Sequence, residues 1–204
     1  AGRQIIVANE NASEVSLIAE KGCLIAGHLQ EVCAWLEGRH ELSEPEECDD
    51  VIADAPEDLS EIMGQEQGKR ALEITAAGGH NLLLIGPPGT GKTMLASRLS
   101  GLLPPLNNHE ALESAAIYSL ISSTSLQKQW RRRPFRSPHH SASLTAMVGG
   151  GAIPGPGEIS LAHNGVLFLD ELPEFERRVL DALREPIESG KIHISRTRAK
   201  IDYP

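Results

Sequence analysis

The sequence predicts an α/β fold with a parallel sheet for most of the chain. Two apolar runs, residues 81–85 and 165–169, have the length of a strand and no polar alternation, which is typical of strands covered on both faces. Each run is followed by a turn and a helical pattern, and strands that alternate with helices favour a parallel sheet. The 204 residues are 40% apolar and 23% charged, which is the composition of a globular protein.

The first part of the chain is predicted to be a separate, smaller piece. Residues 4–8 form a short apolar strand and residues 31–37 a helix, which is too little structure to bury a sizeable core. We expect residues 1–40 to be the end of a domain whose main body lies upstream, in a longer protein, because the chain begins with Ala1 and not with Met.

Charge marks the boundary between this piece and the rest. Residues 1–65 hold 3 basic and 15 acidic side chains, whereas residues 66–204 hold 16 basic and 13 acidic ones, so the net charge of −9 comes from the first part. Residues 41–61 contain ten carboxylates and no Lys or Arg, and such a run repels itself and resists packing. We predict an acidic linker at 41–57 and a second domain at 58–204.

The second domain is predicted to alternate helices and strands. Leu95, Leu99 and Leu102 are spaced to give its second helix one buried face. The last two strands are expected to pair across a turn near residue 197. Helices are expected at residues 64–77, 92–103, 110–120 and 176–189, strands at 81–85, 165–169, 191–196 and 200–203, and a loop-rich stretch at 122–157.

Several classes of protein are excluded by the composition. The longest apolar runs are four or five residues, whereas a membrane-spanning helix needs about 20. No basic segment followed by an apolar one indicates a secretory signal. Cys23, Cys33 and Cys48 are not spaced like zinc ligands, which favours free thiols in a reducing compartment.

A phosphate-binding loop is predicted between the first strand of the second domain and the helix that follows. The motif GxxxxGK[ST] is complete, its glycines let backbone N–H groups line an anion site, and the helix N-terminus adds partial positive charge. Its Lys reaches the β- and γ-phosphates of a nucleotide, and its Thr supplies a hydroxyl to Mg²⁺. A glycine-rich turn before an ordinary helix is the alternative. The motif comprises Gly86, Pro87, Pro88, Gly89, Thr90, Gly91, Lys92 and Thr93.

Two carboxylates are predicted to complete this site. Asp170 and Glu171 directly follow the second buried strand, and the carboxyl end of a parallel strand lies at the edge where the phosphate loop lies. We expect Asp170 to hold Mg²⁺ through water and Glu171 to polarise the attacking water. The alternative is a pair of acidic residues that only begins a helix.

Three long strings in the second domain resemble the competence protein ComM (YifB) family, whose ATPase domain is commonly labelled magnesium-chelatase-like. The phosphate loop, Asp170-Glu171 and residues 62–65 (IMGQ) together make the second domain look like an AAA+ ATPase. The resemblance extends over nearly all of residues 56–204. The N-terminal residues 1–7, followed by Glu10-Asn11, are similar to the end of the Lon-protease-like domain of that family. The strings are residues 134–143 (PFRSPHHSAS), 156–165 (PGEISLAHNG) and 169–175 (LDELPEF).

This resemblance implies a P-loop AAA+ three-layer sandwich with a parallel sheet, preceded by a fragment of a Lon-protease-like α/β domain. It implies a bacterial cytoplasmic protein, without membrane attachment, that assembles into a hexameric ring. It also implies ATP and Mg²⁺ as cofactors. Hydrolysis of ATP would drive migration or unwinding of branched or single-stranded DNA, a helicase activity in recombination and natural transformation. The peptidase Ser and Lys of Lon proteins lie upstream of this chain, so no peptidase activity is expected.

The resemblance also assigns roles to individual residues. It gives the metal role to Thr93 and Asp170, and the catalytic roles to Glu171 and Lys92. Asp58, Leu59, Ile62 and Met63 lie where AAA+ proteins contact adenine, and Met94, after the motif, belongs to the same nucleotide-binding set. The chain stops at Pro204, before the sensor-1 strand, the trans-acting arginine and the lid, so weak hydrolysis is expected from this stretch alone, because such an arginine contributes about 10³–10⁵ in rate.

Three basic features leave alternatives open. His139 and His140 are adjacent, would point to opposite faces of a strand, and favour loop histidines near the nucleotide or a subunit contact over a metal site. Residues 131–133 with Arg136 are either DNA-phosphate contacts or a solvated or intersubunit face. Arg196 and Arg198 either reach a neighbouring subunit's nucleotide or are hairpin surface residues.

The segment 149–157 has five glycines and two prolines, which exclude a stable helix and a central strand. We expect an exposed, mobile loop. By resemblance to AAA+ motors, Ile153 would touch the substrate in the pore, and a linker without function is the alternative.

Three functions remain open for the whole protein. A DNA-directed ATP motor of the ComM kind is preferred because of the Lon-like piece and the strings around His139 and Asp170. The motor subunit of a magnesium chelatase and a nucleotide-binding interaction module are the alternatives.

Overall fold

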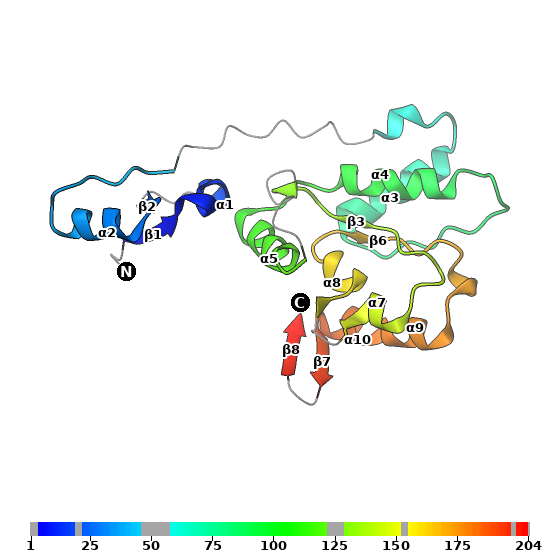
Figure 1. The fold of residues 1–204 in the computed structure, drawn as a ribbon. Coiled ribbons are helices and arrows are strands. Elements are labelled where there is room, and N and C mark those ends of the chain that lie inside the picture. The colour runs from blue at the N-terminus through cyan, green and yellow to red at the C-terminus, as the bar shows by residue number, and fades with distance from the viewer. Residues whose placement is uncertain are drawn as a thin grey trace. The chain divides into compact units, whose positions relative to one another are not determined.

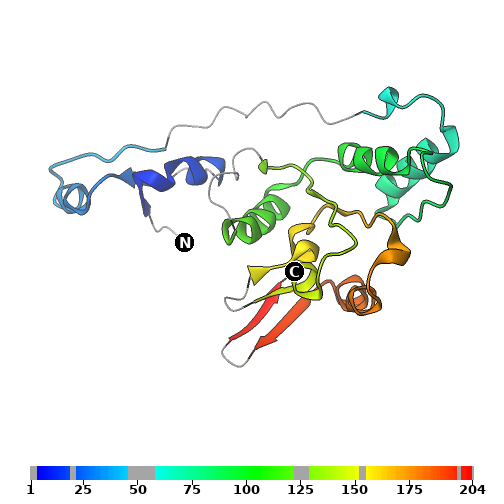
Figure 2. The ribbon, with the colours of Figure 1, turned by 45° about the vertical axis from the view of Figure 1, so that its right-hand side comes forward.

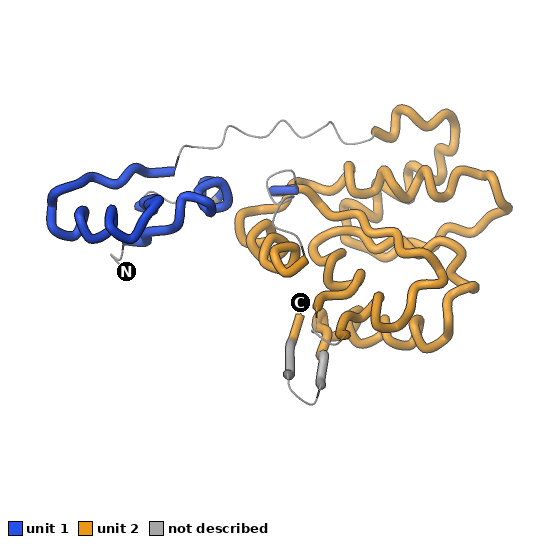
Figure 3. The backbone as a smooth tube through the Cα atoms, in the orientation of Figure 1, with its two compact units in different colours: residues 1–53, 124–130 blue, residues 54–123, 131–204 orange. Residues whose placement is uncertain are grey.

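The computed structural model describes residues 4–18, 22–45, 58–121, 129–151, 155–196 and 199–203, without the side chains of 194–201. The chain divides into two compact units, one of residues 1–53 with 124–130 and one of residues 54–123 with 131–204 (Figure 3). None of the helices in the described ranges has the length and apolar character needed to span a bilayer.

The first unit is built on two parallel strands. β1 pairs with β2 from Ile5 opposite Cys23 to Ala8 opposite Ala26, and the intervening chain includes a helix (Figure 1). The predicted strand at 4–8 and helix at 31–37 are confirmed, whereas α1 and β2 were not expected. The elements are β1 (Ile5–Ala8), the 3-10 helix η1 (Asn9–Asn11), α1 (Ala12–Ile18), β2 (Cys23–Ala26) and α2 (Leu29–Leu36).

The second unit begins with helices on either side of the phosphate loop. α3 and α4 lie side by side (Figures 1 and 2), and Leu72 and Leu95 are buried together with Ile62 from the preceding turn. α5 begins with a reciprocal cap, in which the Asn107 side chain accepts from the Glu110 N–H and the Glu110 carboxylate accepts from the Asn107 N–H. The elements are η2 (Leu59–Glu61), α3 (Glu66–Gly78), α4 (Lys92–Leu102) and α5 (Asn108–Ser119).

A short parallel pair of strands leads to Asp170 and Glu171, which are called the acidic segment below. β3 (Phe135–Arg136) pairs with β6 (Val166–Leu167), and the ring of Phe135 stacks on that of Phe168 with centroids 6.0 Å apart. The predicted strand at 165–169 is therefore confirmed at its centre. With the parallel pair of the first unit, these strands confirm the predicted α/β class.

A second core is formed by residues on both sides of the acidic segment in the sequence. Met147, Phe175, Val179 and Leu183 are buried together and come from helices and turns that are far apart in the sequence. The helices of this region are α7 (Leu144–Val148), α8 (Glu158–Leu161), η3 (Leu172–Glu174), α9 (Arg177–Ala182) and α10 (Arg184–Ser189).

The chain ends in an antiparallel hairpin, as predicted. β7 (Ile192–Arg196) pairs with β8 (Ala199–Tyr203), and Figure 2 shows the two strands in red. The predicted turn at residue 197, with Arg198, and the side chain of Arg196 lie outside the described residues. Ile192 and Tyr203 are buried opposite each other at the open end of the hairpin.

The prediction of a covered strand at residues 81–85 is wrong. The segment has no regular secondary structure, and Leu83 and Ile85 are 67% and 86% exposed. Leu84 packs against the core around Leu72. An apolar run becomes a strand only when neighbouring strands accept its backbone hydrogen bonds, and no strand of the described residues pairs with it.

Two further expectations need correction. The helix expected at 176–189 is two helices, α9 and α10, because Pro186 cannot continue a helix beyond its first turn. The loop-rich stretch 122–157 contains α7 and a small antiparallel pair, β4 (Gly149–Gly150) with β5 (Gly155–Pro156). The expected exposed loop at 149–157 thus has a paired base, whereas Ile153 lies outside the described residues.

Candidate nucleotide-binding site

The phosphate loop has the backbone geometry that its glycines predict. Gly89 and Gly91 have φ values of 75° and 81°, a left-handed conformation that other residues adopt at a cost. The Thr90 hydroxyl donates to the Pro87 carbonyl at 2.9 Å and closes the loop on itself. α4 begins directly after the loop, so the unpaired N–H groups and partial positive charge of its first turn lie beside it.

Lys92 lies across this loop. Its Nζ donates to the carbonyl oxygens of Gly86 and Pro87 at 3.0 and 2.9 Å. An ammonium group carries three donors on a flexible stem, so these bonds can be exchanged for bonds to phosphate oxygens at the same place. The loop residues Pro88 and Gly89 are exposed, as is Met94 on the first turn of α4.

Gln65 holds the phosphate loop through a side-chain hydrogen bond. It precedes α3 with a left-handed φ of 57°, and its side-chain amide donates to the Thr90 carbonyl at 3.0 Å. In the sequence Gln65 stands out only as part of the string 62–65, and no pattern there indicates a contact with the loop. Because this residue is remote in sequence from the loop, only the packing of α3 against α4 brings them together.

The structure brings the loop helix and the acidic segment together. Thr93 Oγ1 donates to Asp170 Oδ2 at 2.8 Å, although the two residues are 77 positions apart. The second oxygen of Asp170 accepts the backbone N–H of Glu171 at 3.0 Å. A hydroxyl and a carboxylate are hard oxygen ligands of the kind Mg²⁺ prefers, so the residues present fit the predicted ion.

Glu171 has an unusual backbone and a partner on another loop. Its φ of 53° is left-handed, and its side chain is 65% exposed. His140 Nδ1 lies 3.3 Å from Glu171 Oε2. The ring centroids of His139 and His140 lie 4.0 Å apart with the ring planes tilted by 36°, and neither residue lies in a strand, which fits the loop histidines favoured above.

The segment predicted to contact adenine is divided between core and surface. Ile62 is 6% exposed and packs in the core, whereas Met63 is 93% exposed. Asp58 accepts the Ser60 N–H at 2.7 Å, which holds the pKa of this carboxyl below its usual value and begins the turn that contains Leu59. The adenine role of these residues stays a prediction.

The arginines at 131–133 and Arg136 are partly neutralised by polar and acidic side chains of the same chain. Arg136 makes two hydrogen bonds of 2.7 Å to the Glu158 carboxylate, and Arg131 donates to the Asn108 side chain. Arg133 pairs with Glu110 at 3.2 Å. These contacts favour a structural role for Arg133 and Arg136 over contact with DNA phosphates.

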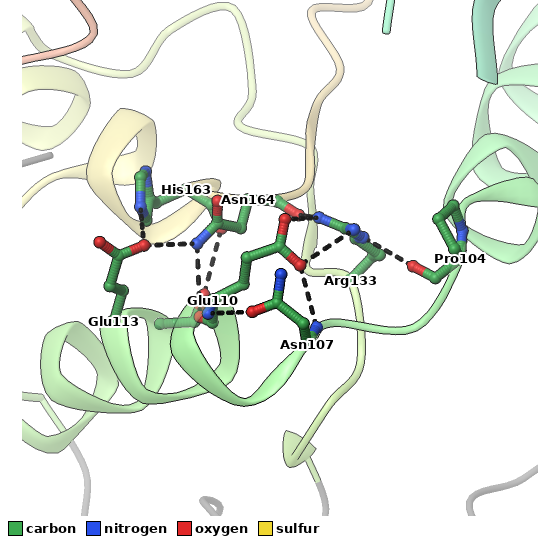
Figure 4. A network of polar contacts seen from close by, with 8 residues as sticks. Pro104, Asn107, Glu110, Glu113, Arg133, His163 and Asn164 are labelled. Atoms are coloured by element: carbon green, nitrogen blue, oxygen red, sulfur yellow. Dashed lines mark hydrogen bonds and ion pairs between the residues drawn. The ribbon is translucent and has the colours of Figure 1, made fainter. Parts of the chain in front are cut away.

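Arg133 is the centre of a polar network (Figure 4). Besides Glu110, its guanidinium donates to the carbonyls of Pro104 at 2.8 Å and Asn164 at 2.9 Å. The network continues through the Asn164 amide to Glu113, which lies 3.4 Å from His163 Nε2. The Asn107 N–H, with Arg133, holds the pKa of Glu110 below its usual value, and the Asn164 amide does the same for Glu113.

The chain is similar to a described family and to several bacterial proteins. A family model described as magnesium chelatase, subunit ChlI, matches residues 58–204. The uncharacterized protein YifB of Escherichia coli K12 is 77% identical over 203 residues, and the competence protein ComM of Haemophilus influenzae is 55% identical over 209 residues. The alignments cover 100% and 99% of this chain but only 40% and 41% of those proteins, so the chain spans about two fifths of their length. The resemblance to the ComM and YifB family is confirmed.

A solved structure supports the fold. A chain in the cryo-EM complex between subunits BchI and BchD of magnesium chelatase matches with a TM-score of 0.53 and 28% identity, over 71% of this chain and 50% of that chain. This confirms the AAA+ type of α/β fold, while the Lon-like assignment of residues 1–40 stays a prediction. By its phosphate loop, its acidic segment and the match over residues 58–204, this chain belongs to the magnesium chelatase subunit ChlI family of AAA+ nucleotide-binding proteins.

Proposed function

We propose that the second unit binds ATP with Mg²⁺ and hydrolyses it to ADP and phosphate. The observation that carries this proposal is the 2.8 Å hydrogen bond from Thr93 to Asp170, because it joins the helix of the phosphate loop to the acidic segment. In this site Thr93 and Asp170 hold the ion, which would neutralise charge on the phosphates. Lys92 and the loop N–H groups bind the β- and γ-phosphates.

Glu171 is the general base in this proposal. The water oxygen forms a bond to the γ-phosphorus while the Glu171 carboxylate takes a proton from that water. The bond between the γ-phosphorus and the bridging oxygen breaks, and its electron pair leaves with ADP. Glu171 adjoins Asp170, whose second oxygen accepts its N–H, so the base and the ion ligand share one rigid turn.

For the longer protein we propose a hexameric, cytoplasmic motor that moves branched or single-stranded DNA in recombination and natural transformation. Support comes from 55% identity to a protein named for competence. The glycine-rich pair β4–β5 is the base of the segment that we propose contacts DNA through Ile153. Replacing this segment by a short Gly-Ser turn should then abolish branch migration while nucleotide still binds.

The motor subunit of a magnesium chelatase is the second candidate, because the matching family model carries that description. ATPase activity of the full-length protein, with and without Holliday-junction or forked DNA, separates the candidates. Stimulation by DNA supports the DNA motor, and stimulation by porphyrin and chelatase partners supports the chelatase. Nucleotide binding without turnover in the full-length protein would leave an interaction module. Glu171→Gln should retain ATP binding and stop turnover, and a wild-type rate in this variant would refute the role of Glu171.

A further inference from the structure

His140 lies where it can control the proposed base. It follows β3, and Glu171 follows β6, the strand that pairs with β3 in parallel. The carboxyl ends of paired parallel strands meet at the same edge, which explains how residues 31 positions apart come into contact. The His140 Nδ1 lies 3.3 Å from Glu171 Oε2, a contact between imidazole and carboxylate at the outer edge of hydrogen-bond distance.

The imidazole is held more firmly than the carboxylate. The His140 side chain is 34% exposed, and its ring contacts that of His139 with centroids 4.0 Å apart and planes tilted by 36°. His139 is itself fixed, because its Nδ1 lies 2.8 Å from the Ser141 hydroxyl and accepts the Ser141 N–H at 3.3 Å. The Glu171 carboxylate is 65% exposed and therefore depends on its partner for a defined orientation.

The backbone of Glu171 makes this dependence stronger. Its left-handed φ of 53° is uncommon for a residue with a side chain, and Asp170 fixes its N–H. The main chain therefore determines where the side chain begins. The remaining side-chain torsions are free in water, and the contact with His140 restricts them.

We propose that His140 is a positioning residue that orients the Glu171 carboxylate toward the attacking water. This inference rests on the proposed hydrolysis of ATP. His140 Nδ1 donates its hydrogen to Glu171 Oε2, which leaves Oε1 to accept the proton of the water. His140 does not touch the nucleotide in this scheme, so its loss lowers the rate of turnover and leaves nucleotide affinity in place.

The test compares three single variants of the full-length protein. His140→Ala should lower kcat about tenfold, since one lost hydrogen bond of this kind and the loosened base together cost that much. His140→Asn should keep at least half of the wild-type kcat, because the Asn amide nitrogen occupies nearly the place of Nδ1. His109→Ala is the matched control, because this imidazole is exposed on α5 and contacts Glu113 and not the site.

Two measurements besides turnover separate positioning from misfolding. The dissociation constant for ATP without Mg²⁺ should stay within twofold of wild type in all three variants. A structure of the His140→Ala variant should show the Glu171 carboxylate in a different or dispersed orientation.

Several outcomes overturn the inference. It is wrong if His140→Ala turns over ATP at or above the wild-type rate, if His140→Asn is as slow as His140→Ala, or if nucleotide affinity falls in parallel with kcat. The proposed function fails separately, and takes this inference with it, if the wild-type protein has no ATPase activity or if Glu171→Gln retains it. If Glu171→Gln shows no ATP turnover while His140→Ala turns over ATP at the wild-type rate, only the role of His140 is refuted.

Discussion

Replacing Lys92 by Ala should weaken ATP binding more than ADP binding. In the structure the Lys92 ammonium donates to the Gly86 and Pro87 carbonyls at 3.0 and 2.9 Å, so nucleotide must take over these donors. ATP offers oxygens of both the β- and γ-phosphates to Lys92, whereas ADP offers only those of the β-phosphate. The difference between the two nucleotides therefore isolates the lysine contact.

The magnitude follows from the bonds exchanged. A hydrogen bond from the ammonium to a charged phosphate oxygen contributes about 1.5–3 kcal/mol, and one from the ammonium to a neutral loop carbonyl contributes about 0.5–1.5 kcal/mol. Exchanging two loop bonds for two phosphate bonds leaves a net gain of roughly 2–3 kcal/mol for ATP, which is roughly 30- to 150-fold in the dissociation constant. ADP gains about half of this free energy, so its affinity should fall about tenfold.

Isothermal titration calorimetry of Lys92→Ala with ATP and with ADP measures both values. Lys191→Ala is the matched control, because this lysine is exposed beside β7 and donates to no phosphate-loop carbonyl in the described residues. Equal ATP affinity in wild type and Lys92→Ala would refute the reasoning. An equal loss for ATP and ADP would show that Lys92 braces the loop and does not bind the γ-phosphate.

Three further predictions concern the scaffold of the site. Gln65→Ala removes the bond to the Thr90 carbonyl, so ATP affinity should fall by about 2- to 10-fold in a fluorescence titration, while Gln65→Glu tests whether the amide donor is needed. Leu72→Ala should destabilise the chain by about 2–5 kcal/mol in urea unfolding, whereas Leu83→Ala should change stability little, because Leu72 is fully buried and Leu83 is 67% exposed. The pKa of Glu110 is lower in the folded than in the unfolded state, so its ionised carboxylate stabilises the fold at pH values above the unfolded pKa. This contribution should disappear as the pH falls through the lowered pKa. Glu110→Gln should therefore flatten the acid side of a plot of urea midpoint against pH.

The phosphate loop and its helix could be predicted because their determinants are local. The glycines fix the turn, and the apolar spacing of α4 fixes which face is buried, so one short string contains nearly all of the information. The sequence also predicts Asp170 beside the phosphate loop, and its 2.8 Å bond to Thr93 agrees with that placement. The expectation that a shared sheet edge causes this placement is wrong, because residues 81–85 form no strand that could share a sheet with β6.

The strand expected at 81–85 shows the limit of this reasoning. Apolar composition indicates that a segment prefers to be covered, but a strand also requires backbone partners from elsewhere in the fold. β3 was missed for the opposite reason, because two residues are too short for any periodicity and the pairing with β6 is non-local. The contact of His140 with Glu171 depends on that pairing, so the sequence alone did not indicate it.

The guanidinium of Arg133 links the segment that carries the phosphate-loop helix to the segment that leads to Asp170. α4 carries Lys92 and Thr93 at its front, and the Pro104 carbonyl lies just beyond its rear end; β6 leads to Asp170, and the Asn164 carbonyl lies just before it. One side chain therefore ties together the segment after α4 and the segment before β6, whose far ends carry Thr93 and Asp170. Because Arg133 also pairs with Glu110, a displacement of α5 would strain the contacts that hold both segments.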